Sequence, residues 1–358
     1  MTNDVPSAPR ITMAVLASPA PMGAQAYEAQ IWEGARGALA SIGAGAWRAR
    51  RLTVRSLRAP LDGNRRLPMR ALIAASPGVR RAVGRALYAG DTVSHRMNLE
   101  LPPAPHGDVA TLHDIVAWRF PDESAPVSAA AEELRGADAV ICVSEFTAQE
   151  AADHLGLRRV RVIPNGVDPR YFDATPLDDE ARAALGLPER YVLHAGGAAA
   201  RKNLEGLADA WPRVQRERPG LTLVLAGLPH PRRTTLFASL PATKLSGMLP
   251  DAVMPGVIAG AEAVVVPSLY EGFGLPVLEA MAARVPVVAA STSSLPEVAG
   301  GHALLTDTTG PEIAVGLLTA TSGDSELRRL VTNARAHAEH YTWERSAREH
   351  ARVWASLA

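Results

Sequence analysis

Short apolar runs alternate along the chain with longer amphipathic stretches. Three apolar runs in the first half predict strands: 11–17, 109–112 and 139–143. Three amphipathic stretches predict helices: 26–41, 128–135 and 147–155. Ser144 is placed to cap the last of these helices. Strands that alternate with helices indicate a parallel sheet covered on both faces.

The second half repeats this order after a polar connection at 173–189. Four further apolar runs predict strands: 191–195, 221–226, 263–267 and 286–290. The predicted fold class is therefore α/β, with two doubly wound parallel sheets in tandem, in which ligands bind beyond the carboxyl ends of the strands. A final helix at 343–357 places Trp343 and Trp354 near one face, so we expect it to dock on the rest of the protein.

The composition is that of a folded protein. The chain has 358 residues, of which 47% are hydrophobic and 21% charged, and it contains no apolar run of 18 residues that could span a bilayer. Its first residues lack the basic and apolar pattern of a signal peptide. The single cysteine, Cys142, lies in the apolar run at 139–143, so we expect a buried thiol in a cytoplasmic protein.

Positive charge is concentrated between residues 36 and 96. This segment holds 13 arginines and only two acids, although the whole chain has a net charge of zero. One interpretation is a patch that binds an anionic partner, and the other is an arginine-rich, solvated helical surface. The candidates for contact with a partner are Arg65, Arg66, Arg80 and Arg81. Nucleic acid fits poorly, because only Trp47 and Tyr88 could stack on bases.

The most informative segment is 267–281, Pro-Ser-Leu-Tyr-Glu-Gly-Phe-Gly-Leu-Pro-Val-Leu-Glu-Ala-Met. Pro276 suits the first position of a helix, and the loop before it would present backbone N–H groups to a phosphate. The candidate binding residues in this loop are Gly272, Phe273, Gly274 and Leu275. Two carboxylates, Glu271 and Glu279, would repel a phosphate and are better suited to accept hydrogen bonds from sugar hydroxyls. The alternative is one solvated glutamate and one helix-capping glutamate.

Glu271 and Glu279, with seven residues between them, resemble the signature of the retaining glycosyltransferases of family 4. Other motifs of that family follow in the same order: Leu-His-Asp at 112–114, Val-Ser-Glu-Phe at 143–146, Ile-Pro-Asn-Gly-Val-Asp at 163–168, Arg-Lys-Asn-Leu at 201–204, Pro-Val-Val-Ala at 286–289, Leu-Pro-Glu-Val-Ala-Gly at 295–300 and Tyr-Thr-Trp-Glu at 341–344. The resemblance extends over residues 108–358, whereas residues 1–107 match only in outline.

The resemblance implies the GT-B architecture, in which two Rossmann-like domains face a cleft. Residues 1–170 would form the acceptor-binding domain and residues 171–340 the domain that binds the nucleotide sugar. Residues 341–358 would form a helix that packs back on the first domain.

The resemblance also implies roles for individual residues. Glu279 would bind the ribose of the donor, and Glu271 would lie near the hydroxyls of its hexose. Lys202 and Arg201 would neutralise the departing diphosphate, since preorganised cations stabilise charge that develops in a transition state. The alternative for this pair is an ordinary helix start with solvated charges. Further donor-binding candidates are Ser268 and Gly197.

His113 follows the strand at 109–112, and the resemblance implies that it contacts the donor sugar near the reacting carbon. Taken alone, it fits a histidine of the core equally well. Asp114 is adjacent and is a weaker candidate for orienting the imidazole. Asn165, Asp168 and Glu297 suit turn-forming or structural roles.

Two positions depart from the family pattern. Many members have a Gly-Gly loop after the first strand, whereas residues 19–25 here contain only Gly23. Some members have an arginine six residues before the lysine that corresponds to Lys202, and that position here is Gly196. We expect Arg201 to take the role of that arginine.

The sequence thus predicts an enzyme that transfers a hexose from a nucleotide diphosphate sugar to a hydroxyl acceptor with retention, by front-face attack and without a metal or other cofactor. The first donor candidate is GDP-mannose, followed by UDP-glucose and UDP-N-acetylglucosamine. We expect an anionic or lipid-linked acceptor, no nucleic acid, and peripheral contact of segment 36–96 with the inner face of the plasma membrane. The alternatives are a GT-B epimerase, a phosphorylase or a silent sugar-binding protein. A dinucleotide oxidoreductase is excluded, because residues 18–23 lack Gly-x-Gly-x-x-Gly.

Overall fold

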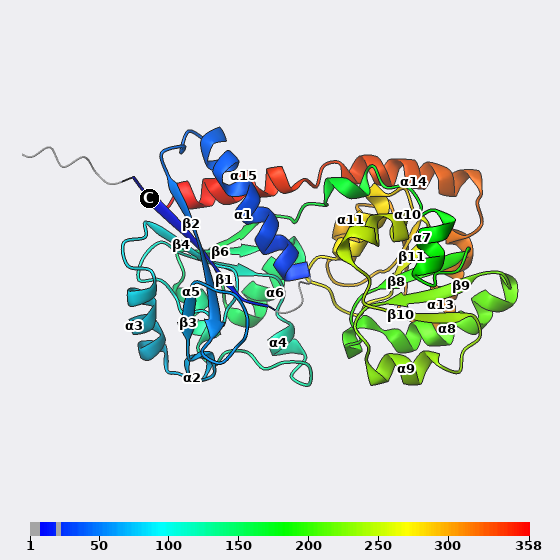
Figure 1. The fold of residues 1–358 in the computed structure, drawn as a ribbon, viewed down its shortest axis with the longest axis horizontal. Helices are drawn as coiled ribbons and strands as arrows, with labels where there is room; N and C mark the ends of the chain where they lie inside the picture. The colour runs from blue at the N-terminus through cyan, green and yellow to red at the C-terminus, as the bar shows by residue number, and fades with distance from the viewer. Residues whose placement is uncertain (1–7, 19–22) are drawn as a thin grey trace, which may run out of the picture. The chain divides into compact units, whose positions relative to one another are not determined.

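The computed structural model describes residues 8–18 and 23–358 and divides the chain into two compact units (Figure 1). Unit 1 comprises Met1–Gly166 together with Trp343–Ala358, and unit 2 comprises Val167–Thr342. The polar connection at 173–189 therefore lies inside unit 2.

Unit 1 is built on a parallel sheet of seven strands in the order β3-β2-β1-β4-β5-β6-β7. The strands are β1 Arg10–Leu16, β2 Arg48–Ser56, β3 Arg65–Leu67, β4 Val93–Arg96, β5 Asp108–Leu112, β6 Ala139–Cys142 and β7 Val160–Val162. The helices are α1 Gly23–Ser41, α2 Met69–Ile73, α3 Pro77–Leu87, α4 Val116–Arg119, α5 Ala130–Gly136, α6 Glu145–Leu155 and α15 Trp343–Ala355. The three strands predicted in this half, at 11–17, 109–112 and 139–143, are confirmed as β1, β5 and β6.

The basic segment between residues 36 and 96 differs from the expected helical surface, because it contributes three strands of the sheet. In β2, with the sequence Arg-Ala-Arg-Arg-Leu-Thr-Val-Arg-Ser, only Leu52 and Val54 are fully buried. These two residues alternate with outward-facing positions, as expected of a strand near a sheet edge, but the surrounding arginines obscure the pattern. The helices of this segment are α2 and α3 and the end of α1.

Two arginines of this segment are buried in the core of unit 1, so the expectation that Arg80 contacts an acceptor is wrong. Arg80 is fully buried and forms hydrogen bonds to Glu133 (Nε–Oε1 2.6 Å) and to the carbonyl oxygens of residues 72, 99, 100 and 101. Arg96 is also fully buried and pairs with Asp108 (Nε–Oδ1 3.0 Å) and with Glu133 (3.3 Å). All five N–H donors of Arg80 have partners inside the fold, so this guanidinium has none left for an acceptor.

The C-terminal helix α15 packs on α1 within unit 1, which confirms the predicted docking. Trp354 is completely buried and Trp343 nearly so. The two helices approach closely at Gly34, where an added Cβ atom would lie 2.8 Å from the Cβ of Ala347. Cys142 is buried in β6, as predicted, and burial raises the pKa of its thiol to about 12.

Unit 2 is built on a second parallel sheet, of six strands in the order β10-β9-β8-β11-β12-β13. The strands are β8 Tyr191–Ala195, β9 Thr222–Ala226, β10 Thr243–Gly247, β11 Ala263–Val266, β12 Val287–Ala290 and β13 Leu304–Thr306. The helices are η1 Pro169–Tyr171, α7 Asp179–Ala184, η2 Ala200–Lys202, α8 Leu204–Glu217, α9 Pro231–Phe237, η3 Asp251–Val253, α10 Met254–Ala259, α11 Leu275–Ala282, α12 Leu295–Ala299, α13 Gly310–Ala320 and α14 Ser325–Ala338.

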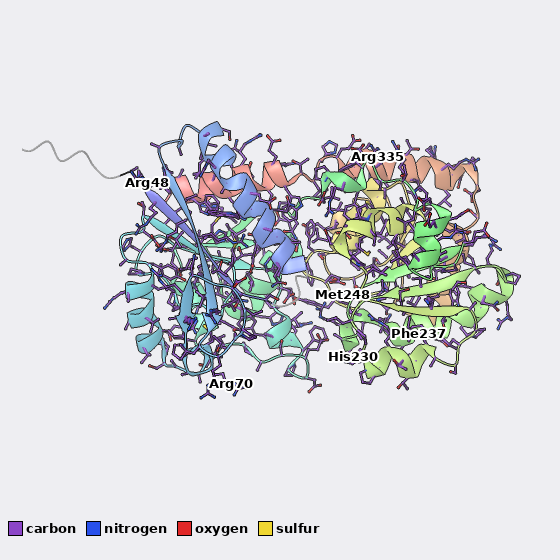
Figure 2. The ribbon with its side chains drawn as sticks, viewed as in Figure 1. Arg48, Arg70, His230, Phe237, Met248 and Arg335 are labelled. Atoms are coloured by element: carbon purple, nitrogen blue, oxygen red, sulfur yellow. The ribbon has the colours of Figure 1, made fainter. Side chains whose placement is uncertain are left out.

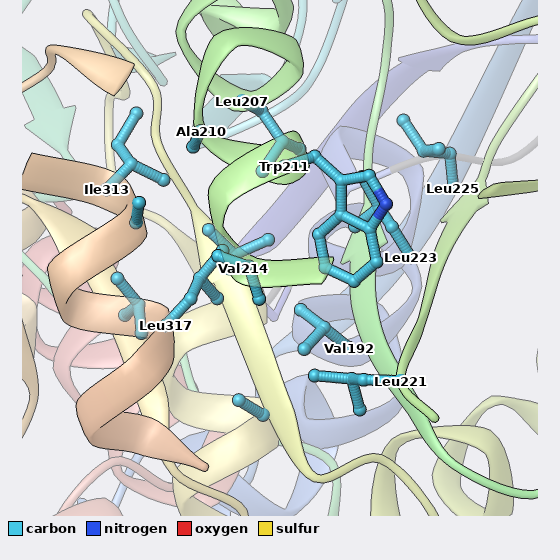
Figure 3. Close-up of a cluster of buried hydrophobic side chains, with 14 of the residues drawn as sticks. Val192, Leu207, Ala210, Trp211, Val214, Leu221, Leu223, Leu225, Ile313 and Leu317 are labelled. Atoms are coloured by element: carbon cyan, nitrogen blue, oxygen red, sulfur yellow. The ribbon is translucent and has the colours of Figure 1, made fainter. Parts of the chain in front are cut away.

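The core of unit 2 lies between the sheet and helices α8 and α13 (Figure 3). Trp211 of α8 is completely buried against Leu223 and Leu225 of β9, and its Nε1–H donates to the carbonyl oxygen of Pro241 (2.9 Å). Because the indole donor is satisfied, this large side chain adds apolar contact without leaving a polar group unpaired.

The strand order of unit 2 reverses between β8 and β11, which are hydrogen-bonded neighbours. In doubly wound sheets, ligands bind at such a reversal, beyond the carboxyl ends of the strands. Gly196 and Gly197 follow β8, and Ser268 follows β11, so the predicted donor motifs meet at this edge of the sheet.

Candidate active site

The loop after β11 leads into α11 through Gly274, a position at which any other residue would be strained. Gly274 precedes the helix with φ +102°, and an added Cβ atom would lie 2.7 Å from Cδ2 of Leu295. The helix begins at Leu275, so Pro276 occupies its second position rather than the first. The N–H of Val277 donates to the carbonyl oxygen of Gly274 (3.0 Å) and is therefore not available to a ligand.

Three hydroxyl residues after β12 hold this loop in place. Ser294 Oγ donates to the carbonyl oxygens of Glu271 (2.9 Å) and Phe273 (2.8 Å). The N–H of Glu271 donates to Ser293 Oγ (3.0 Å), and Thr292 Oγ1 donates to the carbonyl oxygen of Ser268 (2.8 Å). The sequence analysis missed these residues, although the run Ser-Thr-Ser-Ser directly after the predicted strand at 286–290 was a signal for them.

The structure brings three of the predicted site residues, Glu271, Lys202 and Arg201, into contact. Glu271 accepts hydrogen bonds from Lys202 Nζ (2.6 Å) and Ser268 Oγ (2.7 Å), and Arg201 Nη1 lies 3.5 Å from its other oxygen. Burial raises the pKa of Glu271, but the charge and hydrogen bond of Lys202, with Arg201 and Ser268, outweigh it and leave the pKa below its usual value. The group is therefore an ionised carboxylate between two cations, with a net charge of +1 for the three side chains.

Backbone contacts lock the two loops that carry these residues. The N–H of Leu269 donates to the carbonyl oxygen of Arg201 (2.7 Å), and Arg201 Nη1 donates to the carbonyl oxygen of Tyr270 (3.2 Å). Asn203 adopts φ +52° and caps α8 by accepting from the N–H of Gly206 (3.2 Å), while its Nδ2 donates to the carbonyl oxygen of Pro267 (3.0 Å). Asn203 thus fixes the position of Lys202 relative to Glu271.

Glu279 lies on α11 in a group of acidic side chains. Burial, followed by the charges of Asp251 and Asp168, raises its pKa to about 7, against a hydrogen bond from Tyr171 that lowers it. Arg170 joins the two aspartates, at 2.8 Å from each. Asp168 also accepts from the N–H of Arg170 (2.9 Å), which agrees with its expected turn-forming role. A carboxyl group that titrates near neutrality can either donate to a hydroxyl or accept from one.

His113 lies in unit 1, directly after β5, whereas the cations and both glutamates lie in unit 2. Its ring packs edge-on against Tyr27, with ring centroids 4.8 Å apart and planes at 89°. Burial lowers its pKa to about 4, so the imidazole is neutral at pH 7. Its Nε2 is buried and has no hydrogen-bond partner among the described residues, unlike a histidine satisfied within a core. Asp114 Oδ1 accepts from the N–H of Val116 (2.9 Å).

Tyr27 belongs to a chain of hydrogen bonds that runs to the C-terminal helix. Trp354 Nε1 donates to His95 Nδ1, and His95 Nε2 donates to Thr111 Oγ1. Thr111 Oγ1 donates to Tyr27 Oη, which donates to His350 Nε2. His350 Nδ1 donates to the Ser346 carbonyl oxygen. The direction is fixed at both ends, because an indole N–H can only donate and a carbonyl oxygen can only accept. Each imidazole therefore donates through one nitrogen and accepts through the other, and both rings are neutral. Burial, the largest effect on both, lowers the pKa of His350 to about 4 and that of His95 well below its usual value.

Five other predicted positions are exposed: Gly23, Arg65, Arg66, Arg81 and Gly197. Arg65 and Arg66 lie on β3, and Arg81 pairs with Glu132 at the surface of unit 1. Gly23 is the first residue of α1, and the rest of the predicted loop, residues 19–22, lies outside the described part of the chain. Gly197 is exposed, and an added Cβ atom there would meet no atom within 4 Å.

No helix among residues 8–18 and 23–358 is long and apolar enough to cross a membrane. The same residues contain no group of three or more His, Cys, Asp or Glu side chains that could hold a metal ion.

Comparison with known proteins gives matches over both units. Residues 189–320 match the family Glycosyl transferases group 1, and residues 102–171 match Glycosyltransferase Family 4. The chain is 28% identical over 275 residues to O-antigen chain mannosyltransferase B of Escherichia coli, with 71% of each chain covered. It is 32% identical over 205 residues to MMP alpha-(1->4)-mannosyltransferase of Mycolicibacterium hassiacum, an alignment that covers 55% of this chain and 48% of that relative.

Solved structures share the fold at lower identity. Sucrose-phosphate synthase from Thermosynechococcus elongatus is similar with a TM-score of 0.73 at 21% identity, over 98% of this chain and 99% of that one. Anabaena HepE in complex with UDP-glucose is similar with a TM-score of 0.73 at 21% identity, over 97% and 100% of the two chains.

Proposed function

Because this chain belongs to glycosyltransferase family 4 and has its GT-B fold, we propose that it moves mannose from GDP-mannose to a hydroxyl acceptor, with retention at the anomeric carbon. The two mannosyltransferase relatives named above support mannose as the sugar. UDP-glucose and UDP-N-acetylglucosamine are the second candidates, supported by the fold shared with a protein that binds UDP-glucose.

The observation that carries the proposal is the triad of Lys202, Glu271 and Arg201 at the strand reversal of unit 2. When the bond from the sugar to the diphosphate breaks, negative charge grows on the phosphate oxygens. Two cations held in place by one carboxylate, with the amide groups before α11, stabilise that charge without reorganising. In this proposal the cations do the work that a bound metal does in other transferases.

Glu271 orients Lys202 in this scheme and leaves one carboxylate edge for the hydroxyls of the hexose. Glu279 would bind the ribose, because its carboxyl can serve as donor and acceptor near neutral pH. The neutral His113, with its unpartnered Nε2, would contact the donor sugar.

The proposed transfer is a front-face reaction. The bond between the anomeric carbon and the phosphate oxygen breaks, the acceptor oxygen bonds to the anomeric carbon on the same face, and the acceptor proton passes to the leaving phosphate. The reaction needs no covalent enzyme intermediate and no further co-substrate, because the leaving phosphate takes the acceptor proton.

The acceptor in this proposal is anionic or lipid-linked. Support comes from the exposed arginines of unit 1. Two of them, Arg65 and Arg66, have no ion-pair partner within the described residues. Peripheral contact of this surface with an anionic membrane follows from the same charges.

The first test is the thermal shift of the protein with GDP, UDP, ADP and dTDP and their sugars, followed by nucleotide release with and without acceptor. A ligand that binds only the folded state raises the melting temperature. We expect a shift with GDP and GDP-mannose that Glu279→Ala removes and the matched surface variant Glu312→Ala retains. A shift with UDP alone would indicate UDP-glucose or UDP-N-acetylglucosamine as the donor. If none of the nucleotides shifts the melting temperature, the proposal is contradicted.

A further inference from the structure

Arg233 lies on α9 with its side chain buried beneath the loops that follow β8 and β9. Only 2% of the residue is exposed. Its Nη2 donates to the carbonyl oxygen of Gly196 (2.5 Å) and its Nη1 to that of Leu228 (2.9 Å). In Figure 2, His230 and Phe237 mark the two ends of the helix that carries it.

The charge of this guanidinium is not compensated. Among residues 8–18 and 23–358, no carboxylate lies within ion-pair distance of Arg233, and its buried Nε has no hydrogen-bond partner. Its sequence neighbour Arg232 is instead more exposed and pairs with Glu205 (2.6 Å). Burying a cation without a counter-charge costs free energy, so a fold that keeps one there has a site that an anion would complete.

The backbone around the guanidinium leaves no room for another side chain. Gly227 has φ +143°, and an added Cβ atom there would lie 2.2 Å from the carbonyl oxygen of Gly196 and 2.9 Å from Nη2 of Arg233. The N–H of Gly196 continues the sheet hydrogen bonds by donating to the carbonyl oxygen of Ala226 (3.1 Å), and that of Gly227 donates to Gly247 (2.8 Å). The guanidinium therefore occupies a position formed by two glycines.

This position adjoins the triad. The pKa of His194 on β8 is lowered to about 4, mainly by burial and also by the charges of Arg233 and Lys202, against the hydrogen bond to the Val265 carbonyl oxygen and the charge of Glu271, which raise it. One imidazole thus feels all three charges, which places Arg233 in the same neighbourhood as Lys202 and Glu271.

Arg233 also sets the direction of a peptide group. The described peptide bonds are all trans, and in a planar trans peptide the C=O and the following N–H point in opposite directions. Because the carbonyl of Gly196 points at the guanidinium, the N–H of Gly197 points away from it. Gly197 is exposed, and an added Cβ atom there would meet no atom within 4 Å, so a ligand has room beside this peptide group.

We infer that Arg233 is a positioning residue for the donor diphosphate: it turns the Gly197 N–H toward a phosphate oxygen and supplies an uncompensated positive charge beneath the phosphates. The inference rests on the proposed function, since it requires a nucleotide diphosphate as the ligand. It adds a cation from a separate helix to Arg201 and Lys202.

The test compares the affinities of GDP, GMP and guanosine for the wild type and for Arg233→Met, by calorimetry at two salt concentrations. We expect the affinity for GDP to fall about tenfold, with a smaller salt dependence, while that for guanosine changes less than about twofold. Arg233→Lys keeps the charge but cannot donate to both carbonyls, so we expect an intermediate loss for GDP. Arg232→Met is the matched control and should bind all three ligands as the wild type does.

Equal affinities of the wild type and both Arg233 variants for GDP would overturn the inference. An equal loss for all three ligands would also overturn it, because a merely structural role weakens nucleoside and diphosphate binding alike. Should Arg233→Met fail to fold, the difference between GDP and guanosine in Arg233→Lys decides. A wild type that binds none of the nucleotides would instead refute the proposed function, and the inference with it.

Discussion

Both units bury arginine side chains, but they treat the charges in opposite ways. In unit 1, Arg80 and Arg96 share Glu133, and Arg96 also pairs with Asp108. In unit 2, Arg233 has only carbonyl oxygens as partners. A buried cation with a matched carboxylate completes a structure, whereas one without a carboxylate indicates a place where a ligand supplies the missing charge. Burial alone therefore does not separate a structural arginine from a functional one.

The largest effect is expected from Glu133→Ala, which leaves Arg80 without a carboxylate in the core of unit 1 and leaves Arg96 with Asp108 alone. Removing one partner of a buried ion pair costs about 3 to 5 kcal/mol. Urea denaturation should show a loss of that size for Glu133→Ala and a smaller loss for Arg233→Met, which removes a charge without a counter-ion together with two hydrogen bonds to carbonyl oxygens. Losses of the same size for both variants would show that the two arginines do not differ as described.

The next effect concerns turnover. Replacing Lys202 by Met removes a cation that stabilises the departing diphosphate, so we expect kcat to fall about 100-fold or more with little change in melting temperature. Initial rates of nucleotide release measure it, and Lys244→Met, at the other lysine of the chain, is the control. A variant with unchanged kcat would show that Lys202 serves only to hold Glu271.

Glu279 supplies a pH test within unit 2. Its folded pKa of about 7 lies above the value of 4.5 for the free side chain, so the folded state binds the proton more tightly than the unfolded state. Unit 2 should therefore lose stability as the pH rises from about 4.5 to 7 and stay at the lower value above that. We expect Glu279→Gln, which cannot ionise, to flatten this decline in urea midpoints measured between pH 5 and 8. The same decline in the variant would mean that another group titrates.

A smaller effect is expected in unit 1 from Tyr27→Phe. The substitution removes one hydroxyl from the chain of hydrogen bonds, leaving Thr111 and His350 each without a partner at one atom, at a cost of about 1 to 3 kcal/mol. Differential scanning calorimetry measures the loss. His113→Ala is the comparison, since it removes the ring that packs on Tyr27 and leaves the chain intact. Equal melting temperatures for wild type and Tyr27→Phe would contradict the assigned hydrogen-bond order.

The smallest effect is expected from the exposed arginines. Replacing Arg65 and Arg66 by serine should raise the acceptor KM a few-fold at low salt and leave donor binding unchanged, because exposed charges act mainly on encounter and are screened by salt. The consecutive exposed residues Arg158 and Arg159, which precede β7 at the opposite edge of the same sheet, provide a matched double-serine control. An unchanged KM would separate the acceptor from this surface.

Local patterns were sufficient to predict much of the fold. The strands that became β1, β5, β6, β8, β9, β11 and β12 are short apolar runs bounded by turn residues, and Ser144 caps α6 as expected, accepting from the N–H of Thr147 (3.0 Å). In contrast, β2 was missed because its two buried residues stand among arginines.

Site features that depend on distant residues could not be predicted. Arg80 appeared to be a surface residue because its partner Glu133 lies 53 positions away in the sequence. Arg201, which we expect to replace the arginine absent at Gly196, contacts Glu271 and Tyr270, and a second guanidinium, that of Arg233, 37 residues further on than Gly196, donates to the Gly196 carbonyl oxygen. Only contacts between residues distant in the sequence show which partner each arginine binds.

The return of α15 to unit 1 affects the order in which the protein folds during synthesis. The sheet of unit 2 is encoded without interruption between residues 167 and 342, so it can form as soon as that stretch has left the ribosome. The face of α1 that packs on α15 stays uncovered until residues 343–355 emerge. Domains usually fold in the order of their translation, but here the unit that begins first is completed last.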